Sequence, residues 1–191
     1  MVLYASNNFK VGLKILFEQQ PCSIESVEFV KPGKGQVFSR VKLRKLLTGQ
    51  LIEKTFRATD TLLRANVVDI TLMYIYSDQK IWYFMNRSTF DQIGIDQNIM
   101  QDKYKWLVEQ NDYVITLWND RPISVLVSNF VNLQVISEVS SFSLDTVMSN
   151  NRKKLSKLST GHIIQVPLFI KIGDVVKVDT RTGNYISRVN K

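Results

Sequence analysis

Short runs of alternating apolar and polar residues are the feature that most limits how this chain can fold. One early run places apolar side chains at every second position, at Val11, Leu13, Ile15 and Phe17. This period of two is typical of a strand with one buried face. Further strands are predicted over residues 26–30, 36–46 and 50–57, with Thr48 and Gly49 in a turn. Together these four strands predict a small antiparallel unit.

The same pattern returns twice along the chain. From residue 65 the strand-like runs are NVVDITLMYIY, KIWYFMN, DYVITLW and ISVLV, and from residue 130 they are VNLQVISEV, HIIQVPLFI, DVVKVD and YISRV. We expect one short helix over residues 102–110 and a polar loop between VNLQVISEV and HIIQVPLFI. The sequence therefore predicts an all-β protein of three modules, 1–64, 65–129 and 130–191, each a small Greek-key barrel of the OB or SH3-like type.

Charge is distributed unevenly over these three modules. The net charge is +8. Residues 1–64 carry 11 Lys/Arg and 5 Asp/Glu (+6), residues 65–129 carry 5 and 8 (−3), and residues 130–191 carry 9 and 4 (+5). Two basic ends around an acidic middle indicate an elongated body that contacts a polyanion at separate places. The alternative is that these charges serve solubility.

Several classes of protein are disfavoured by what the sequence contains. There is no apolar run long enough to span a membrane, and MVLYASNNFK does not resemble a signal peptide, so we expect a cytoplasmic protein with no membrane partner. The single Cys22 and single His162 leave no disulfide or zinc cluster. Without a nucleophile elbow, phosphate loop or dinucleotide motif, an enzyme is the less favoured class, and we expect no metal and no catalytic residues.

The segment FVKPGKGQVFSRVKLRK predicts a basic hairpin. In its second strand one parity carries Val37, Ser39, Val41 and Leu43, and the other carries Phe38, Arg40, Lys42 and Arg44. The first set is expected to face the core, and successive cations of the second set would lie roughly 6–7 Å apart on the outer face. Such a row of cations repels itself unless an anion meets it, which favours a phosphate backbone. The alternative is a solvated edge strand whose charges discourage aggregation.

The turn of this hairpin isolates one ammonium group. Lys34 lies between Gly33 and Gly35, after Lys31 and Pro32. The glycines permit a tight turn and the proline stiffens its approach, so the side chain of Lys34 is expected to project from a rigid tip. A lysine that enters a narrow site, or that another enzyme modifies, requires this isolation.

Several segments resemble one protein family closely. FVKPGKGQVFSRVKLRKLLTG resembles the first domain of bacterial translation elongation factor P, and VPLFIKIGDVVKVDTRTGNYISRV is similar to the C-terminal signature of that family. WYFMN, TLWNDRPISV and NFV agree in the middle of the chain. The resemblance covers almost the whole chain at matching spacing.

The resemblance implies an SH3/KOW-like first barrel and two OB-like barrels in an elongated, L-shaped arrangement. Members of the family bind the 70S ribosome between the peptidyl and exit sites and relieve stalling at consecutive prolines, and we expect this chain to act as a monomer. In many members the lysine at the position of Lys34 is extended by a lysine-modifying enzyme with a lysine-derived, β-lysyl-type group. This group reaches the acceptor end of peptidyl-tRNA, and no other cofactor is implied. An elongation-factor-P-like paralogue and a general RNA-binding module remain alternatives.

The resemblance also implies contacts with RNA. The candidate residues in the described signatures are Arg40, Lys42, Arg44, Arg181, Thr182, Tyr185 and Arg188. For Tyr185 and the neighbouring Gly183, maintenance of a tight hairpin is the alternative role. In the family a glycine-rich GDTATGG loop approaches the exit-site codon. Here SLDTVMSNNRKKLSK replaces it and keeps only Asp145 and Thr146, which are the candidate RNA contacts of this segment. The added cations of this segment either attract phosphate loosely or reflect drift of the loop.

Overall fold

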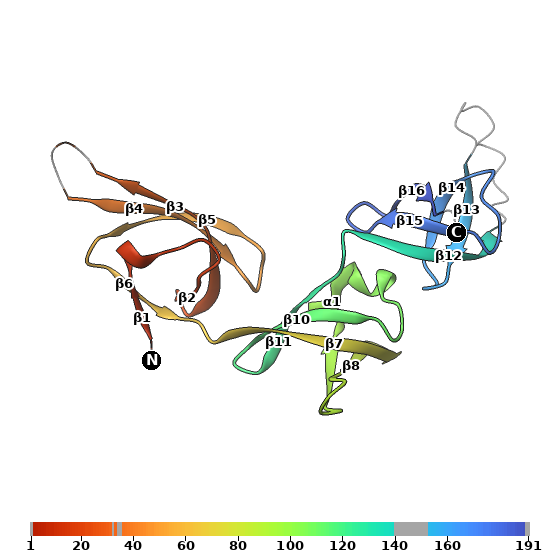
Figure 1. Ribbon diagram of the computed structural model, residues 1–191, viewed down its shortest axis with the longest axis horizontal. Coiled ribbons are helices and arrows are strands. Elements are labelled where there is room, and N and C mark those ends of the chain that lie inside the picture. The colour runs from red at the N-terminus through yellow and green to blue at the C-terminus, as the bar shows by residue number, and fades with distance from the viewer. Residues whose placement is uncertain (1, 32, 34–35, 140–152, 190–191) are drawn as a thin grey trace. The chain divides into compact units, whose positions relative to one another are not determined.

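The chain folds into three antiparallel β-sheets (Figure 1). The computed structural model describes residues 2–31, 33, 36–139 and 153–189. Residues 3–64, 67–126 and 130–188 form the first, second and third sheet. Helical structure in the described part of the chain is confined to short turns, and no described helix is long and apolar enough to cross a membrane. The predicted all-β class with three β modules is confirmed.

The first sheet has six strands in the order β1-β6-β2-β3-β4-β5. These are β1 (Leu3–Ala5), β2 (Lys14–Phe17), β3 (Gln20–Val30), β4 (Phe38–Lys45), β5 (Leu51–Arg57) and β6 (Thr61–Arg64), with a 3₁₀ turn, η1, at Ser6–Asn8. The sequence predicted four strands and missed the short β1 and β6. The strand predicted from Val11 begins only at Lys14, because Gly12 adopts a turn conformation with φ +86° and Val11 is 68% exposed.

The core of the first sheet is a single apolar cluster. It contains Phe9, Ile15, Cys22, Ile24, Val41, Leu43 and Phe56. The Phe9 and Phe56 rings meet edge to face at 5.5 Å, a favoured aromatic geometry. Cys22 is fully buried and unbridged, and burial raises the pKa of its thiol, so it packs as a small apolar residue.

The second sheet has the order β11-β10-β7-β8-β9. Its strands are β7 (Val67–Asp78), β8 (Ile81–Met85), β9 (Gln92–Asp96), β10 (Asp112–Trp118) and β11 (Arg121–Leu126). The helix predicted over residues 102–110 is confirmed only in its first part. One α-helical turn, α1 (Gln97–Met100), leads into a 3₁₀ turn, η2 (Gln101–Trp106), and residues 107–110 are not helical. Asp96 starts α1, because its Oδ1 accepts hydrogen bonds from the backbone nitrogens of Asn98 and Ile99 at 2.8 and 3.2 Å.

The third sheet has the order β14-β13-β12-β15-β16. Its strands are β12 (Phe130–Val139), β13 (Lys153–Leu158), β14 (Ile163–Pro167), β15 (Val175–Asp179) and β16 (Asn184–Arg188). Strand β13 lies where the sequence predicted only a polar loop. The strand was missed because its lysines make the segment look polar. In the structure Ser156 and Leu158 are fully buried, while Lys153 and Lys157 are exposed.

The chain divides into two compact units. The first contains residues 1–71 and 114–125, and the second contains residues 72–113 and 126–191. In the second unit, Trp106 at the end of η2 is 5% exposed and belongs to the buried cluster of the third sheet. Its ring meets His162 edge to face at 5.0 Å, and a Cβ on Gly183 would lie 3.9 Å from it. Trp106 therefore fastens η2 to the third sheet.

The buried face of β4 generates a prediction about stability. Leu43 is fully buried in the first core, whereas Leu47, just after the same strand, is 44% exposed. Leu43→Ala is expected to lower the free energy of unfolding by about 2–5 kcal/mol, because it removes apolar contacts and leaves a cavity. Leu47→Ala, the matched control, is expected to change it by less than about 0.5 kcal/mol. Urea unfolding followed by circular dichroism measures both, and equal effects would contradict the assigned core.

Candidate nucleic-acid interface

The hairpin formed by β3 and β4 carries the sequence-predicted tip. Antiparallel pairing extends to Val30 opposite Phe38, so residues 31–37 connect the two strands. Lys31 and Gly33 are exposed in this connection. Lys34, Pro32 and Gly35 lie outside the described residues, and their proposed roles stay predictions.

Strand β4 has the two faces that its alternation predicted. Ser39, Val41 and Leu43 are 3%, 0% and 0% exposed. Arg40 and Lys42 on the opposite face are exposed and Arg44 is half-buried. The prediction was wrong for Val37, which precedes the strand and is 39% exposed. The cations of β4 therefore line one solvent-facing side of the sheet.

This row of cations is compensated by glutamates from the adjacent strands. Arg40 lies 3.5 Å from Glu28 on β3 and 3.4 Å from Glu53 on β5. Arg44 donates from Nε to Glu25 at 2.9 Å. The expectation that the row repels itself without an external anion is therefore wrong, because cross-strand carboxylates already offset the two arginines. A phosphate must compete with these exposed ion pairs, which individually contribute little to stability.

Lys42 differs from its two neighbours on β4. It lies opposite Ser26 on β3 and opposite Glu53 on β5, and forms no ion pair within the described part of the chain. Strand β4 lies between β3 and β5, so the alternative of a charged edge strand is also wrong. Among the three predicted contacts on β4, Lys42 is the cation most available to a phosphate.

The hairpin formed by β15 and β16 holds Arg181 in a fixed orientation. Arg181 donates from Nε and Nη2 to the two oxygens of Asp179 at 3.0 and 2.6 Å, and its backbone nitrogen also donates to Asp179 at 2.9 Å. The Arg181 side-chain hydrogen bond, followed by that of its backbone, lowers the pKa of Asp179. The Arg181 side chain stays 61% exposed, so its remaining donors are accessible to another anion.

Two further residues complete this cationic surface. The ring of Phe130 on β12 is 42% exposed and lies beneath Lys177 Nζ at 4.9 Å and Arg181 Cζ at 5.7 Å. Sequence reasoning missed Phe130 and Lys177. The sequence feature that could have indicated them is the alternation of β12 and β15. The pairing of these strands places Phe130 opposite Asp179 and Asn132 opposite Lys177. An exposed ring between two cations offers a stacking surface to an unpaired base.

The other predicted residues of the third module have mixed surroundings. Tyr185 is partly buried against the third core, which favours packing over RNA contact. Thr182 is exposed and its Oγ1 accepts from the backbone of Asn184 at 3.3 Å, while Arg188 lies 3.8 Å from Asp174. Gly183 has φ +72° and its amide donates to Asp179 at 2.8 Å, so glycine is required by the turn.

The predicted Asp145 and Thr146 lie outside the described residues. Within the described ranges, no three His, Cys, Asp or Glu residues are arranged to hold a metal ion.

Three β modules, of which the first and third carry cationic hairpins, are typical of a translation factor that contacts RNA, and comparison with known proteins agrees. Three family models match in succession: Elongation factor P (EF-P) KOW-like domain at residues 5–62, Elongation factor P (EF-P) OB domain at 67–125, and Elongation factor P, C-terminal at 131–188. The chain belongs to the bacterial elongation factor P family and is a translation elongation factor.

Similar proteins support this assignment along the whole chain. The elongation factor P proteins of Buchnera aphidicola subsp. Acyrthosiphon pisum and of Buchnera aphidicola subsp. Schizaphis graminum are each 54% identical over 189 residues. These residues cover 99% of this chain and all of each relative. Among solved structures, eukaryotic translation initiation factor 5A from Methanococcus jannaschii has a TM-score of 0.52 at 14% identity, over 65% of this chain and 94% of its own. A translation initiation factor eif-5a family protein from Naegleria fowleri has a TM-score of 0.51 at 14% identity, over 66% of this chain and 98% of its own. At this identity the two structures support the fold alone.

The different surroundings of the β4 cations predict different effects on RNA binding. Lys42→Ala is expected to weaken binding of tRNA and to reduce the slope of log affinity against log salt by about one, because one phosphate contact is lost. Glu53→Gln is expected to tighten binding by roughly two- to fivefold at low salt, since it removes the carboxylate that pairs with Arg40 and lies opposite Lys42.

Fluorescence anisotropy with labelled tRNA across a salt series measures both effects. Lys10→Ala is the control, because Lys10 is exposed and lies outside the hairpin. A Lys42 variant that behaves like the Lys10 variant would remove β4 from the interface.

The Asp179–Arg181 pair predicts a pH dependence of stability. The pKa of Asp179 is lowered from its ordinary value of 3.8, so the pair stabilises the fold fully above that pH and loses its effect as pH falls below it. Asp179→Asn is expected to lower the unfolding midpoint at pH 7, with the difference from the unchanged protein shrinking below pH 3.8. Thermal unfolding between pH 7 and pH 2 tests this, with exposed Asp78→Asn as the control. A constant difference across that range would show that the carboxylate charge is not responsible.

Proposed function

We propose that this elongation factor binds the cytoplasmic ribosome between the peptidyl and exit sites, as a monomer, and speeds peptide-bond formation at consecutive prolines. The observation that carries the proposal is the sequence KPGKG, residues 31–35, at the end of the paired β3–β4 hairpin in a chain that belongs to the elongation factor P family. In this role Lys34 contacts the acceptor end of peptidyl-tRNA.

The physical need for such a factor comes from proline itself. Its ring fixes φ and its nitrogen is part of that ring, so the reacting groups of successive prolines are poorly oriented. A factor that holds the peptidyl-tRNA terminus restores alignment without chemistry of its own, since a misplacement of about 1 Å costs on the order of 10²-fold in rate. The ribosome then makes the bond, and the factor contributes position.

The β3–β4 hairpin is suited to present a side chain at a distance. Its two strands pair from Cys22 opposite Lys45 to Val30 opposite Phe38, and β5 supports β4 along the whole span from Phe38 to Arg44. Three paired strands with a buried face are more stable than an isolated hairpin, so the register of β3 and β4 is held up to the end of their pairing. The cations on its outer face, Lys42 above all, are proposed to hold the RNA backbone while the tip is in place.

Extension of Lys34 by a lysine-derived, β-lysyl-type group completes the proposal. A longer side chain that carries an additional amine reaches further and adds hydrogen-bond donors and positive charge beside the tRNA terminus. A lysine-modifying enzyme is the implied partner for this step. Intact-mass analysis of the natively expressed protein tests it, because the added group raises the mass of the chain and of the peptide containing Lys34.

The proposal predicts a selective loss of function at the tip. Lys34→Ala is expected to leave the unfolding transition unchanged and to abolish relief of stalling at a run of prolines, because the ammonium group that contacts the tRNA terminus is gone. A reconstituted translation assay compares a reporter containing consecutive prolines with one that lacks them.

The exposed Lys31, in the same connection, provides the matched control. Lys31→Ala is expected to retain most of the effect. Full relief of stalling by the Lys34 variant would refute the proposed role, and equal stimulation of both reporters by the unchanged protein would instead indicate a general RNA-binding factor.

A further inference from the structure

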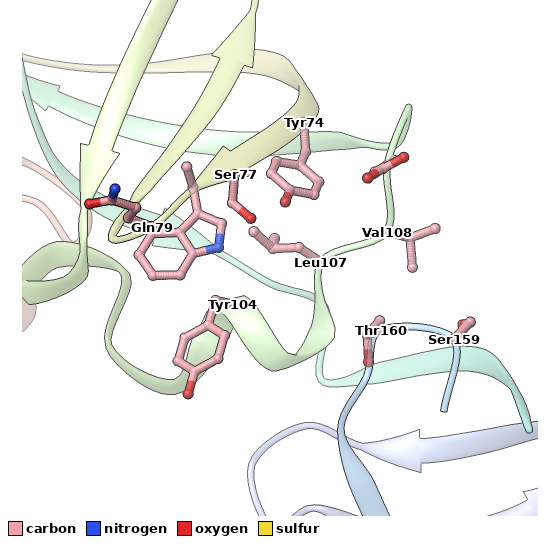
Figure 2. A pocket seen from close by; sticks show the side chains of 10 residues that line it. Tyr74, Ser77, Gln79, Tyr104, Leu107, Val108, Ser159 and Thr160 are labelled. Atoms are coloured by element: carbon pink, nitrogen blue, oxygen red, sulfur yellow. The ribbon is translucent and has the colours of Figure 1, made fainter. Parts of the chain in front are cut away.

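A recess outside the proposed RNA-binding surfaces lies in the second unit (Figure 2). Its volume is about 630 Å³, within the usual range for sites that hold small groups. Its lining residues are Tyr74, Ser77, Gln79, Trp82, Tyr104, Leu107, Val108, Glu109, Ser159 and Thr160. Figure 2 shows Tyr104 and Gln79 on one side of the space and Ser159 and Thr160 on another.

Aromatic rings form one wall of this recess. The rings of Trp82 and Tyr104 are stacked, with centroids 5.2 Å apart and an angle of 29° between their planes. Trp82 is 7% exposed and fixed in the second core, whereas Tyr104 on η2 is 37% exposed. Tyr74 and Leu107, both buried, extend the apolar lining. Such a wall attracts cations through its ring faces and the methylene groups of a side chain through apolar contact.

Glu109 gives the recess its charge. It is the one lining residue that is charged at neutral pH, and it forms no ion pair with any residue in the described part of the chain. Burial raises the pKa of Tyr74, and the charge of the Glu109 carboxylate contributes to that rise, so the carboxylate lies near the Tyr74 hydroxyl. Lys105, on the neighbouring η2, is already held by Asp102 at 2.7 Å. The negative charge of Glu109 is therefore left for a ligand.

We propose that this recess binds a guanidinium or alkylammonium group, with the aliphatic part of the ligand against Trp82 and Tyr104 and its charge beside Glu109. Either an arginine or lysine side chain of a partner protein, or a free organic cation, supplies this chemistry. A phosphate or a nucleotide is disfavoured, because Glu109 repels it and no lysine or arginine lines the recess.

The Trp82 indole N–H signal in a nitrogen–proton correlation spectrum reports on binding directly. The probes are N-acetyl-Gly-Arg-Gly-amide, the same tripeptide with citrulline, putrescine and adenosine, each titrated at constant ionic strength. The arginine tripeptide is expected to shift the Trp82 signal saturably. Citrulline keeps nearly the same shape without the charge and is expected to bind at least threefold more weakly. Comparable or tighter binding of putrescine identifies a free organic cation as the source, and tighter binding of the arginine tripeptide identifies a protein side chain.

Two variants test the assigned groups. Glu109→Gln is expected to weaken arginine binding by roughly three- to fivefold, and Tyr104→Leu by roughly two- to fivefold. Asp120→Asn is the matched control, since Asp120 is exposed in the first unit and its loss changes the net charge equally. The proposal is overturned if neither cation shifts the Trp82 signal, if citrulline or adenosine binds as well as arginine, or if Glu109→Gln binds like Asp120→Asn.

Discussion

The pairing of β4 with β3 on one side and β5 on the other is the interaction on which the candidate interface depends. It fixes which side chains of β4 face the core and which face solvent, because the pleat turns every second residue the same way. Val41 and Leu43 are buried in the first core as a result, and the cations between them are exposed. A shift of the register by one residue would bury those cations and expose the apolar side chains. The same strand pairing therefore determines both the buried core and the basic surface.

Each cationic surface of this protein already contains carboxylates. Glu28, Glu53 and Glu25 accompany the arginines of β4, and Asp179 holds Arg181. These acids orient the guanidinium groups in advance, so fewer side-chain conformations are lost when a phosphate arrives. They also lower the net attraction. Moderate binding of this kind permits faster release of RNA than a surface of unpaired cations, which would hold RNA more tightly.

The sequence predicted most of the fold because its strands alternate clearly, and it failed where another force decided the outcome. The burial of Ser39, Val41 and Leu43 follows from period two alone. Strand β13 was missed because its lysines resemble a solvated loop, although its other parity is buried against the third core. Pairing between distant residues, such as Arg40 with Glu28 or Lys177 above Phe130, depends on strand register, which a single sequence does not specify. The recess around Glu109 likewise joins residues from separate strands and turns.

The insertion of Trp106 into the core of the third sheet affects how this chain can be recombined. Replacing Trp106 by a smaller residue would leave a cavity, since Leu133, Leu158 and Val178 of the same cluster are almost fully buried. A chimera that took only residues 130–191 from a relative would combine the relative's third sheet with Trp106 of this chain. An exchange point before η2 would take Trp106 and the third sheet from the same protein. Trp106 and the third-sheet residues of its buried cluster are accordingly expected to be inherited together, because a smaller side chain at residue 106 would leave a cavity among them.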